Sequence, residues 1–555
     1  MKNQANDINT TINTTNGNNT TINNAVIFNG VLTDAVIING VLTVPEGVTA
    51  IAEGAFANRD DLKEVRLPST LRSIGERAFA DCSSLEEVNL PEGLRRIDNS
   101  AFERCSSLVR VSIPASVTRV GMSVWRDCSS LQTLTVSGKE TRFGVSPFEG
   151  CTSLREVSLP VGMNRMGYAM FKGCTALEEV IIPDGVTYIM GHAFEGCTSL
   201  VEVRIPDGVT SIGESSFEGC GSLRNVTLPE GVVVIGARCF LYTAIKEVQL
   251  PKGLTELGAD AFSGTPLTEV AIPDSVTSIA EGAFEDCYAL TEVVLPESLT
   301  SIGKNAFAGC EALKEAVLPE SLTSIGDGAF AHTALTRVEL PEGVTSIGER
   351  TFWECYQLEE VVLSEGVTDI GAYAFACCEL LKEAVLPESL TSIGAGAFAS
   401  TALTAVQLPT RLTEIGRTAF WGCTSLVEVS LPTGLTVLWD GAFEGCSSLK
   451  KVIIPDGVTA IEDSTFWGCE ALTEVTIPES VTEIGYHAFE GCTSLVEVSL
   501  PTGLTVLKED AFKGCISLEK VNITSSVSYI GMGAFAGCTS LKVSLPEGVT
   551  TDIEE

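Results

Sequence analysis

The stretch LEEVNLPEGLRRIDNSAFERC (Leu85–Cys105) decides the fold, because close variants of it fill the chain from about residue 45 to the end. Apolar and polar side chains alternate over residues 87–90, and a period of two indicates a β-strand. Pro91 lacks an N–H, so we expect the strand to end there. Phe102 follows an alanine and is expected to fill the core before the chain returns to the next strand.

The aromatic position of this unit recurs 22 times, from Phe56 to Phe535, at intervals of 23 residues or, four times, of 22 residues. Such a fixed period is typical of a solenoid, in which each repeat buries its apolar side by stacking on its neighbours. No repeat has room for a helix of ordinary length. We therefore expect a mainly β solenoid with one parallel strand per repeat, stacked about 4.8 Å apart. Short strands, turns or 3₁₀ turns should form the opposite side.

The repeat also resembles a known family. The positions that carry the resemblance are, in one repeat, Leu426, Val429, Leu431, Pro432, Leu435, Leu438, Ala442, Phe443 and Cys446. This pattern resembles the BspA-like (Treponema-type) leucine-rich repeats over about nine tenths of the chain. The resemblance implies a leucine-rich repeat solenoid with its parallel β-sheet on the concave face. It also implies roles in cell adhesion, host-protein binding and other protein contacts, and it brings no catalytic residues.

Composition divides the chain into three parts. Residues 1–24 are rich in Asn and Thr and are expected to be a disordered tail. Residues 25–44 hold a shorter echo of the strand pattern and should form capping strands at the open end of the sheet. Residues 45–555 should form the leucine-rich repeat solenoid. No basic and apolar leader is visible, so we expect a cytoplasmic protein or one that reaches the surface without a leader.

The charge excludes several partners. With 35 basic and 72 acidic residues the net charge is −37, which argues against nucleic acid and against anionic membrane surfaces. No apolar run approaches the roughly 18 residues of a membrane span, so we expect no membrane insertion.

Seventeen of the 19 cysteines lie three residues after the aromatic position, and only Cys239 and Cys377 lie elsewhere. A buried thiol behaves as a small apolar side chain, so we interpret the column as core packing rather than as disulfides. The four short repeats replace this cysteine by threonine and lose one residue of the following turn. We expect each of these threonines to hydrogen-bond that tighter turn through its hydroxyl. They are Thr243, Thr265, Thr333 and Thr401.

The sequence contains no recognisable catalytic or cofactor-binding motif. The three histidines are far apart in the repeat order, and neither a phosphate-binding loop nor a dinucleotide fingerprint is present. We therefore expect a protein that is not an enzyme and has no cofactor or metal site. Columns of glutamate could attract basic partners or a divalent cation, although keeping a long solenoid in solution explains them better.

One repeat, residues 137–147, departs from the pattern. It loses the strand proline, places Glu140 at an apolar position and replaces the alanine before the aromatic residue by Pro147. We expect a local kink there. Four methionines follow, Met163, Met166, Met170 and Met190, and they are expected to fill the core rather than to line a ligand pocket.

The candidate binding site is an aliphatic stripe on the strand face between residues 271 and 385. The fifth strand position is mostly polar elsewhere, but here it is mostly Ala or Val, beside a column of glutamates at the third position. An exposed apolar stripe with a polar rim is a common signature of a protein-binding site. The candidate residues are Glu269, Ala271, Glu292, Val294, Glu315, Val317, Glu339, Glu360, Val362, Glu383 and Val385.

We therefore predict a non-enzymatic protein-binding repeat protein that acts in adhesion or in host or partner recognition through its concave face. The alternative is an intracellular scaffold or structural solenoid without a role at the surface. The sequence does not identify the partner.

Overall fold

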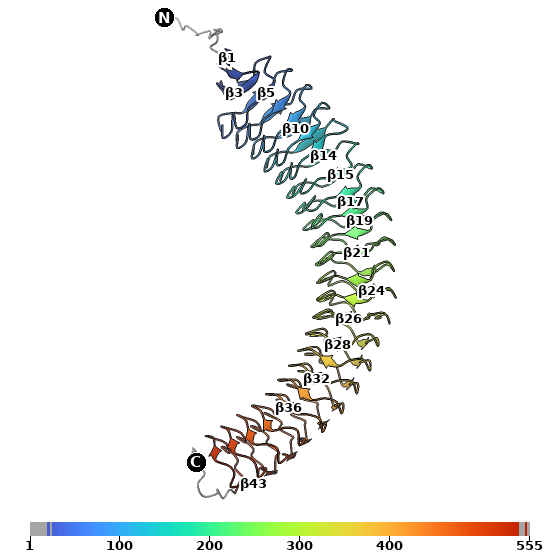
Figure 1. Cartoon of the computed structure of the whole chain (residues 1–555), viewed down its shortest axis with the longest axis vertical. Coiled ribbons are helices and arrows are strands. Elements are labelled where there is room, and N and C mark those ends of the chain that lie inside the picture. The colour runs from blue at the N-terminus through green and yellow to red at the C-terminus, as the bar shows by residue number, and fades with distance from the viewer. Residues whose placement is uncertain (1–18, 23–24, 543–549, 552–555) are drawn as a thin grey trace. The chain divides into compact units, whose positions relative to one another are not determined.

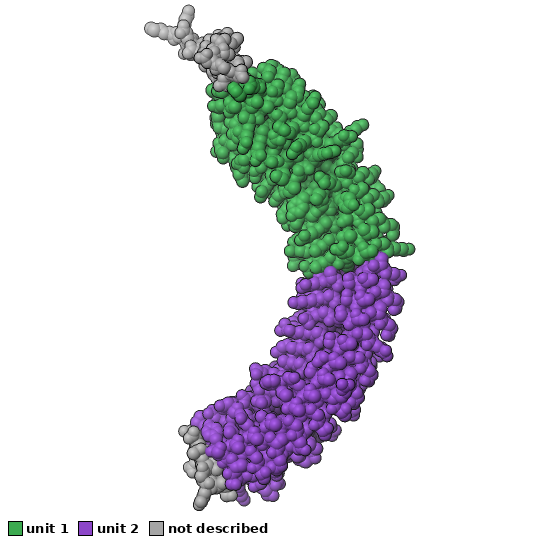
Figure 2. Space-filling model, in the orientation of Figure 1, with its two compact units in different colours: residues 1–267 green, residues 268–555 purple. Residues whose placement is uncertain are grey.

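The computed structural model of the chain describes residues 19–22, 25–542 and 550–551. Its contacts divide the chain into two compact units, Met1–Leu267 and Thr268–Glu555 (Figure 2). Each unit is a stack of similar turns of β-structure (Figure 1), and the described residues contain no helix. The expected parallel β-solenoid is confirmed.

Most repeats contribute two short strands rather than the single strand that the sequence predicts. The first follows the apolar–polar alternation, and the second follows the turn after the strand proline. Each strand pairs in parallel with its equivalent in a neighbouring repeat, as Glu64 does with Glu87 and Ser73 with Arg96. We call the two surfaces that they form the long-strand face and the short-strand face.

The strands of the long-strand face have three or four residues. In the first unit they are β4 (Val41–Thr43), β6 (Glu64–Arg66), β8 (Glu87–Asn89), β10 (Arg110–Ile113), β12 (Thr133–Val136), β14 (Glu156–Ser158), β17 (Glu202–Arg204) and β19 (Asn225–Thr227). In the second unit they are β22 (Glu269–Ala271), β24 (Glu292–Val294), β27 (Arg337–Glu339), β29 (Glu360–Val362), β31 (Glu383–Val385), β33 (Ala405–Gln407), β35 (Glu428–Ser430), β37 (Lys451–Ile453), β39 (Glu474–Thr476), β41 (Glu497–Ser499) and β43 (Lys520–Asn522).

The strands of the short-strand face have two residues. In the first unit they are β5 (Ala50–Ile51), β7 (Ser73–Ile74), β9 (Arg96–Ile97), β11 (Arg119–Val120), β13 (Arg142–Phe143), β15 (Arg165–Met166), β16 (Tyr188–Ile189), β18 (Ser211–Ile212), β20 (Val234–Ile235) and β21 (Glu256–Leu257). In the second unit they are β23 (Ser278–Ile279), β25 (Ser301–Ile302), β26 (Ser324–Ile325), β28 (Ser346–Ile347), β30 (Asp369–Ile370), β32 (Ser392–Ile393), β34 (Glu414–Ile415), β36 (Val437–Leu438), β38 (Ala460–Ile461), β40 (Glu483–Ile484), β42 (Val506–Leu507), β44 (Tyr529–Ile530) and β45 (Thr550–Thr551).

The start of the first unit differs from the repeats. β1 (Asn19–Ile22), β2 (Ala25–Phe28) and β3 (Val31–Ala35) pair in antiparallel order, and β3 then pairs in parallel with β5. Residues 19–22 of the predicted tail pair with β2. The rest of that predicted tail, residues 1–18 and 23–24, lies outside the described residues. The boundaries of the predicted cap and solenoid stay predictions.

The core of each unit is a column of stacked aromatic rings. Phe79 is fully buried and lies between Phe56 and Phe102, with ring centroids 5.5 and 5.2 Å away and nearly parallel planes. The spacing of parallel strands sets this distance, so one ring per repeat fills the space between repeats. Offset stacked rings contribute about 0.5–1.5 kcal/mol per pair beyond the area they bury.

The cysteine column is confirmed as core packing. All 19 cysteines are free thiols, and every column member except the half-buried Cys538 is buried. Each hydrogen-bonded thiol of the column donates to the carbonyl of the aromatic residue one repeat earlier, as Cys105 Sγ does to Phe79 O at 3.2 Å. Burial raises the pKa of Cys82 to about 11 and the pKa of Cys220 to about 12. These two thiols therefore stay protonated and able to donate at neutral pH.

The threonines of the short repeats make the expected turn bonds. Thr333 and Thr401 each donate from Oγ1 to the carbonyl of the aromatic residue three positions earlier, at 2.9 Å. A threonine hydroxyl thus bonds within its own repeat, whereas a cysteine thiol bonds to the repeat before it. This change of partner accompanies the loss of one residue from the turn.

The irregular repeat interrupts the short-strand face. β13 ends one sheet and β15 begins the next. Gly144 donates its N–H to Val120 O at 2.9 Å, as Gly121 of the preceding regular repeat does to Ile97 O at 2.8 Å, but the N–H of the equivalent Gly167 has no acceptor among the described residues. Of the methionines that follow, Met163, Met166 and Met170 are buried as expected, but Met190 is 38 % exposed, so the prediction is wrong for that residue. The sequence therefore locates the irregularity, and the structure shows that it is a break in hydrogen bonding.

Candidate functional site

The predicted stripe lies on the long-strand face of the second unit, where the side chain of every second strand residue points outward. Strand alternation exposes the third and fifth positions and buries the fourth, as in β24, where Val293 is buried and Val294 is 52 % exposed. Val317 and Val385 are more exposed still, at 82 % and 72 %. Large aliphatic side chains at such exposure gain little from folding, because most of their surface stays in water.

The structure brings these residues together in two groups. Ala271 pairs in register with Val294, and Val362 pairs in register with Glu339 and Val385. Val317 belongs to neither group because its repeat forms no strand on the long-strand face; only an isolated bridge joins Glu292 to Glu315 there. The stripe is therefore a pair of patches separated by one loosely paired repeat, which spacing in the sequence does not reveal.

A groove of about 400 Å³ lies on the second patch. Its lining residues are Glu359, Glu360, Val361, Val362, Leu380, Lys382, Glu383 and Val385. Four of them are predicted site residues, and they come from β29 and β31. The groove thus combines aliphatic side chains with three carboxylates and one ammonium group.

The charges beside the stripe are partly balanced. Arg337 in β27 lies 3.3 Å from Glu339 and 3.2 Å from Glu360. Glu269 and Glu292, in contrast, face each other in register, and both are exposed. Two like charges about 4–5 Å apart repel by roughly 1 kcal/mol in water. A partner that brings positive charge to the first patch would remove this repulsion.

Sequence reasoning missed a larger groove in the first unit. It measures about 670 Å³ and is lined by residues of two neighbouring repeats, among them Ile181, Val201, Glu202 and Arg204. Ile181 is 76 % exposed. The signal was present in the sequence, because Ile181 is an aliphatic residue at the same fifth strand position as the predicted stripe.

One cluster of side chains has the composition of a metal site. His487 Nδ1 lies 2.5 Å from Glu490 Oε2 and 3.8 Å from Asp510 Oδ2. Lys513 Nζ lies 3.3 Å from the same glutamate and 3.1 Å from the same aspartate. The positive charge that this cluster holds is therefore an ammonium group, so we assign it no metal. The sequence prediction of no metal, cofactor or catalytic site stays a prediction.

None of the described residues forms a helix long and apolar enough to cross a membrane.

The chain matches the family model described as "BspA type Leucine rich repeat region (6 copies)" over residues 49–178, 164–291, 277–402, 345–473, 391–508 and 459–555. A comparison with curated proteins gave no match. Among solved structures, a leucine-rich repeat protein from Bacteroides ovatus is 32 % identical, with 64 % of this chain and 81 % of that chain covered and a TM-score of 0.44.

Two more solved structures are similar. A leucine-rich cell surface protein from Faecalibacterium prausnitzii is 23 % identical over 84 % of this chain and 95 % of that chain, with a TM-score of 0.23. The leucine-rich repeat protein of T. pallidum is 26 % identical over 41 % of this chain and 78 % of that chain, with a TM-score of 0.20. The repeat pattern and the match of the family model from residue 49 to residue 555 show that this chain belongs to the BspA-type leucine-rich repeat family.

Proposed function

We propose that this chain binds a protein partner through the long-strand face of its second unit, in adhesion or partner recognition. The observation that carries the proposal is the exposure of Val294, Val317 and Val385 beside a column of glutamates. Isolated exposed valines are common on protein surfaces, but aliphatic residues at one position of successive repeats form a larger patch.

The chemistry of the patch indicates the kind of partner. Aliphatic side chains of β29 and β31 would cover apolar groups of the partner, and Glu360 and Glu383 would pair with Lys or Arg at its rim. We therefore expect a partner surface with exposed apolar residues surrounded by positive charge. Such binding should weaken at high salt, because the rim charges are exposed.

The test compares two double variants in the same unit and on the same face. Val362→Glu with Val385→Glu places two carboxylates in the groove, and Ser430→Glu with Ser499→Glu adds the same charge at the same strand position outside it. Affinity capture with the full chain, quantified by mass spectrometry, should lose its main partner only with the first variant. Equal capture by both variants would remove the stripe from consideration.

A second experiment separates adhesion from the alternative role as an internal scaffold. Intact producing cells are labelled with a reagent that does not cross membranes, and the labelled fraction of this chain is measured. Labelling supports adhesion. A chain found only in the soluble interior contradicts adhesion and leaves the scaffold role.

A further inference from the structure

Four arginines occupy one position of the short-strand face in four successive repeats of the first unit. They begin strands β9, β11, β13 and β15, and all four are exposed (Arg96, Arg119, Arg142 and Arg165). Arg119 pairs in register with both Arg96 and Arg142. The other short strands begin with Ser, Ala, Val, Tyr, Asp, Glu or Thr. This arginine ladder is therefore a local departure from the repeat.

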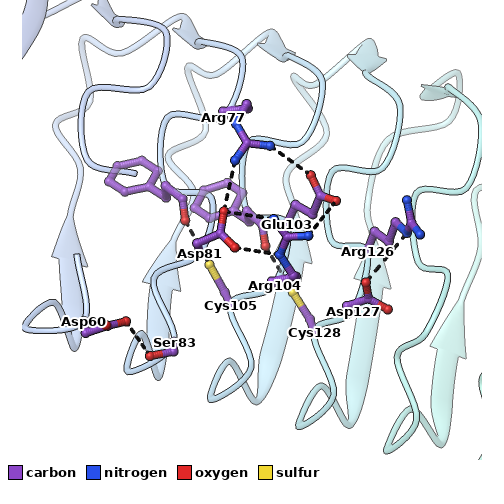
Figure 3. A network of polar contacts seen from close by, with 12 residues as sticks. Asp60, Arg77, Asp81, Ser83, Glu103, Arg104, Cys105, Arg126, Asp127 and Cys128 are labelled. Carbon is purple, nitrogen blue, oxygen red and sulfur yellow. Dashed lines mark hydrogen bonds and ion pairs between the residues drawn. The ribbon is translucent and has the colours of Figure 1, made fainter. Parts of the chain in front are cut away.

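Three of the four ladder arginines form no ion pair with the described residues. Arg96 lies 3.1 Å from Asp98, but the other three make no ion pair with any described residue. Arginines of the turns in the same part of the chain are paired: Figure 3 shows Arg77 and Arg104 on either side of Asp81, at 3.0 and 2.6 Å. Acidic residues outnumber basic residues two to one in this chain, so a ladder without partners is not a consequence of composition.

Stacking the ladder works against folding. Registered strands lie about 4.8 Å apart, and two like charges at that distance repel by roughly 1 kcal/mol in water. Long side chains can spread to reduce the repulsion, but Arg119 and Arg142 form no ion pair with a described residue that would offset it. An external anion would offset it, and a guanidinium group binds carboxylate or sulfate through paired hydrogen bonds.

Two grooves lie along the ladder. One, of about 370 Å³, includes Arg96 and Arg119 in its lining, and the other, of about 540 Å³, includes Arg142 and Arg165. The second groove lies at the break between β13 and β15. The N–H of Gly167, which lines that groove, has no acceptor among the described residues and remains able to bind a ligand.

The other lining residues include acids, amides and apolar side chains. The first groove holds Glu53, Glu76, Asp98 and Asn99, and the second holds Asn164, Glu140 and the half-buried ring of Phe143. Carboxylates accept hydrogen bonds from hydroxyl groups, amides both accept and donate them, and an aromatic ring can cover the apolar face of a sugar. A ligand that fits must therefore carry anions at intervals, with hydroxyl groups between them.

We propose that the arginine ladder binds an acidic polysaccharide, a linear sugar chain with carboxylate or sulfate groups, laid along the short-strand face of the first unit. The arginines bind the anionic groups, and the acidic and amide residues of the two grooves bind the hydroxyls. Nucleic acid and acidic peptide fit less well. DNA and acidic peptides carry no hydroxyl groups between their anions, so neither would use the carboxylate and amide groups of the two grooves.

The test measures binding of the full chain by calorimetry at low and at moderate salt. The probes are polygalacturonate and heparin oligosaccharides. Neutral dextran, poly-L-glutamate and oligo(dT) are titrated in the same way, as ligands of other chemical classes. Arg119→Gln with Arg142→Gln should weaken binding of an acidic polysaccharide by at least about ten-fold, since two charge-assisted contacts are lost. Arg165→Gln alone should weaken it less, and binding should fall as salt rises.

The matched control is Arg110→Gln with Arg155→Gln, which removes two exposed arginines from the same unit outside the ladder. This control should change the affinity by less than about two-fold. The proposal is overturned if neither acidic polysaccharide binds at low salt or if the ladder variant binds as well as the control. Equal or tighter binding of poly-L-glutamate or oligo(dT) would also overturn it, because the ligand class would then be wrong.

Discussion

Replacing glycine by alanine at Gly144 and at Gly167 should have opposite effects on stability. The two glycines occupy the same position in neighbouring repeats, and neither has a positive φ. At Gly144 an added Cβ would lie 2.6 Å from the carbonyl carbon of Gly121, and at Gly167 the nearest atom, Gly144 O, is 3.6 Å away. The first contact is too close for any real Cβ, and the second is an ordinary contact.

The magnitude follows from these distances. At Gly144 the neighbouring backbone must move by about 0.8 Å to reach an ordinary contact, and overpacking of this kind costs roughly 1–3 kcal/mol. Alanine also restricts the unfolded chain, which stabilises the fold by about 0.4–1 kcal/mol. Gly144→Ala should therefore destabilise the first unit by about 0.5–2.5 kcal/mol. Gly167→Ala should be neutral or stabilise it by up to about 1 kcal/mol.

Hydrogen exchange measured by mass spectrometry is the suitable assay, because a solenoid opens locally and peptides from residues 120–170 report on these repeats alone. Exchange should accelerate in Gly144→Ala and stay equal or slow in Gly167→Ala. Gly121→Ala, whose Cβ would meet Asn99 N at 2.6 Å, provides a second crowded site. If Gly167→Ala accelerates exchange as much as Gly144→Ala does, there is no free space for a Cβ beside Gly167, and the argument from these contact distances is wrong.

Three more predictions concern the core. Alkylation of the native chain should modify the half-buried Cys377 and Cys538 before the other thiols. Burial raises the pKa of Cys377 above its ordinary value of 9.0. The rate of Cys377 alkylation, measured by mass spectrometry, should therefore still rise above pH 9. Thr401→Val should cost about 1 kcal/mol in urea unfolding, because Phe398 O loses a buried hydrogen bond, whereas Thr401→Ser should restore it. Phe79→Leu should cost about 2–4 kcal/mol, since two stacked ring contacts and some volume are lost, and a cost below 1 kcal/mol would contradict the stacking argument.

The repeat spacing in the sequence is enough to predict much of the fold. The interval between Phe56 and Phe79 predicts the stack of rings, because one residue per turn at the same position must meet its neighbours. The replacement of cysteine by threonine at Thr333 together with a shorter turn predicts a hydroxyl bond within the repeat. Both inferences rest on local chemistry that is repeated many times, so the sequence contains what is needed.

The candidate sites could be predicted only in part. Alternation in the strands is enough to expose Val294 and Val385, and the same rule applied to Ile181 would have located the larger groove. The separation of Val317 from its neighbours could not be predicted, because it depends on whether adjacent repeats approach closely enough for backbone pairing.

The sequence by itself therefore determined which residues share a column, since that follows from the repeat length alone. Only the tertiary structure decided how far apart successive members of a column lie and which charges find partners. Gly144 and Gly167 hold equivalent positions, yet one donates to the repeat before it and the other does not. Arg104 and Arg119 are the same residue type, yet only Arg104 reaches a carboxylate. Distances between repeats and between side chains depend on packing in three dimensions, and a repeat pattern does not encode them.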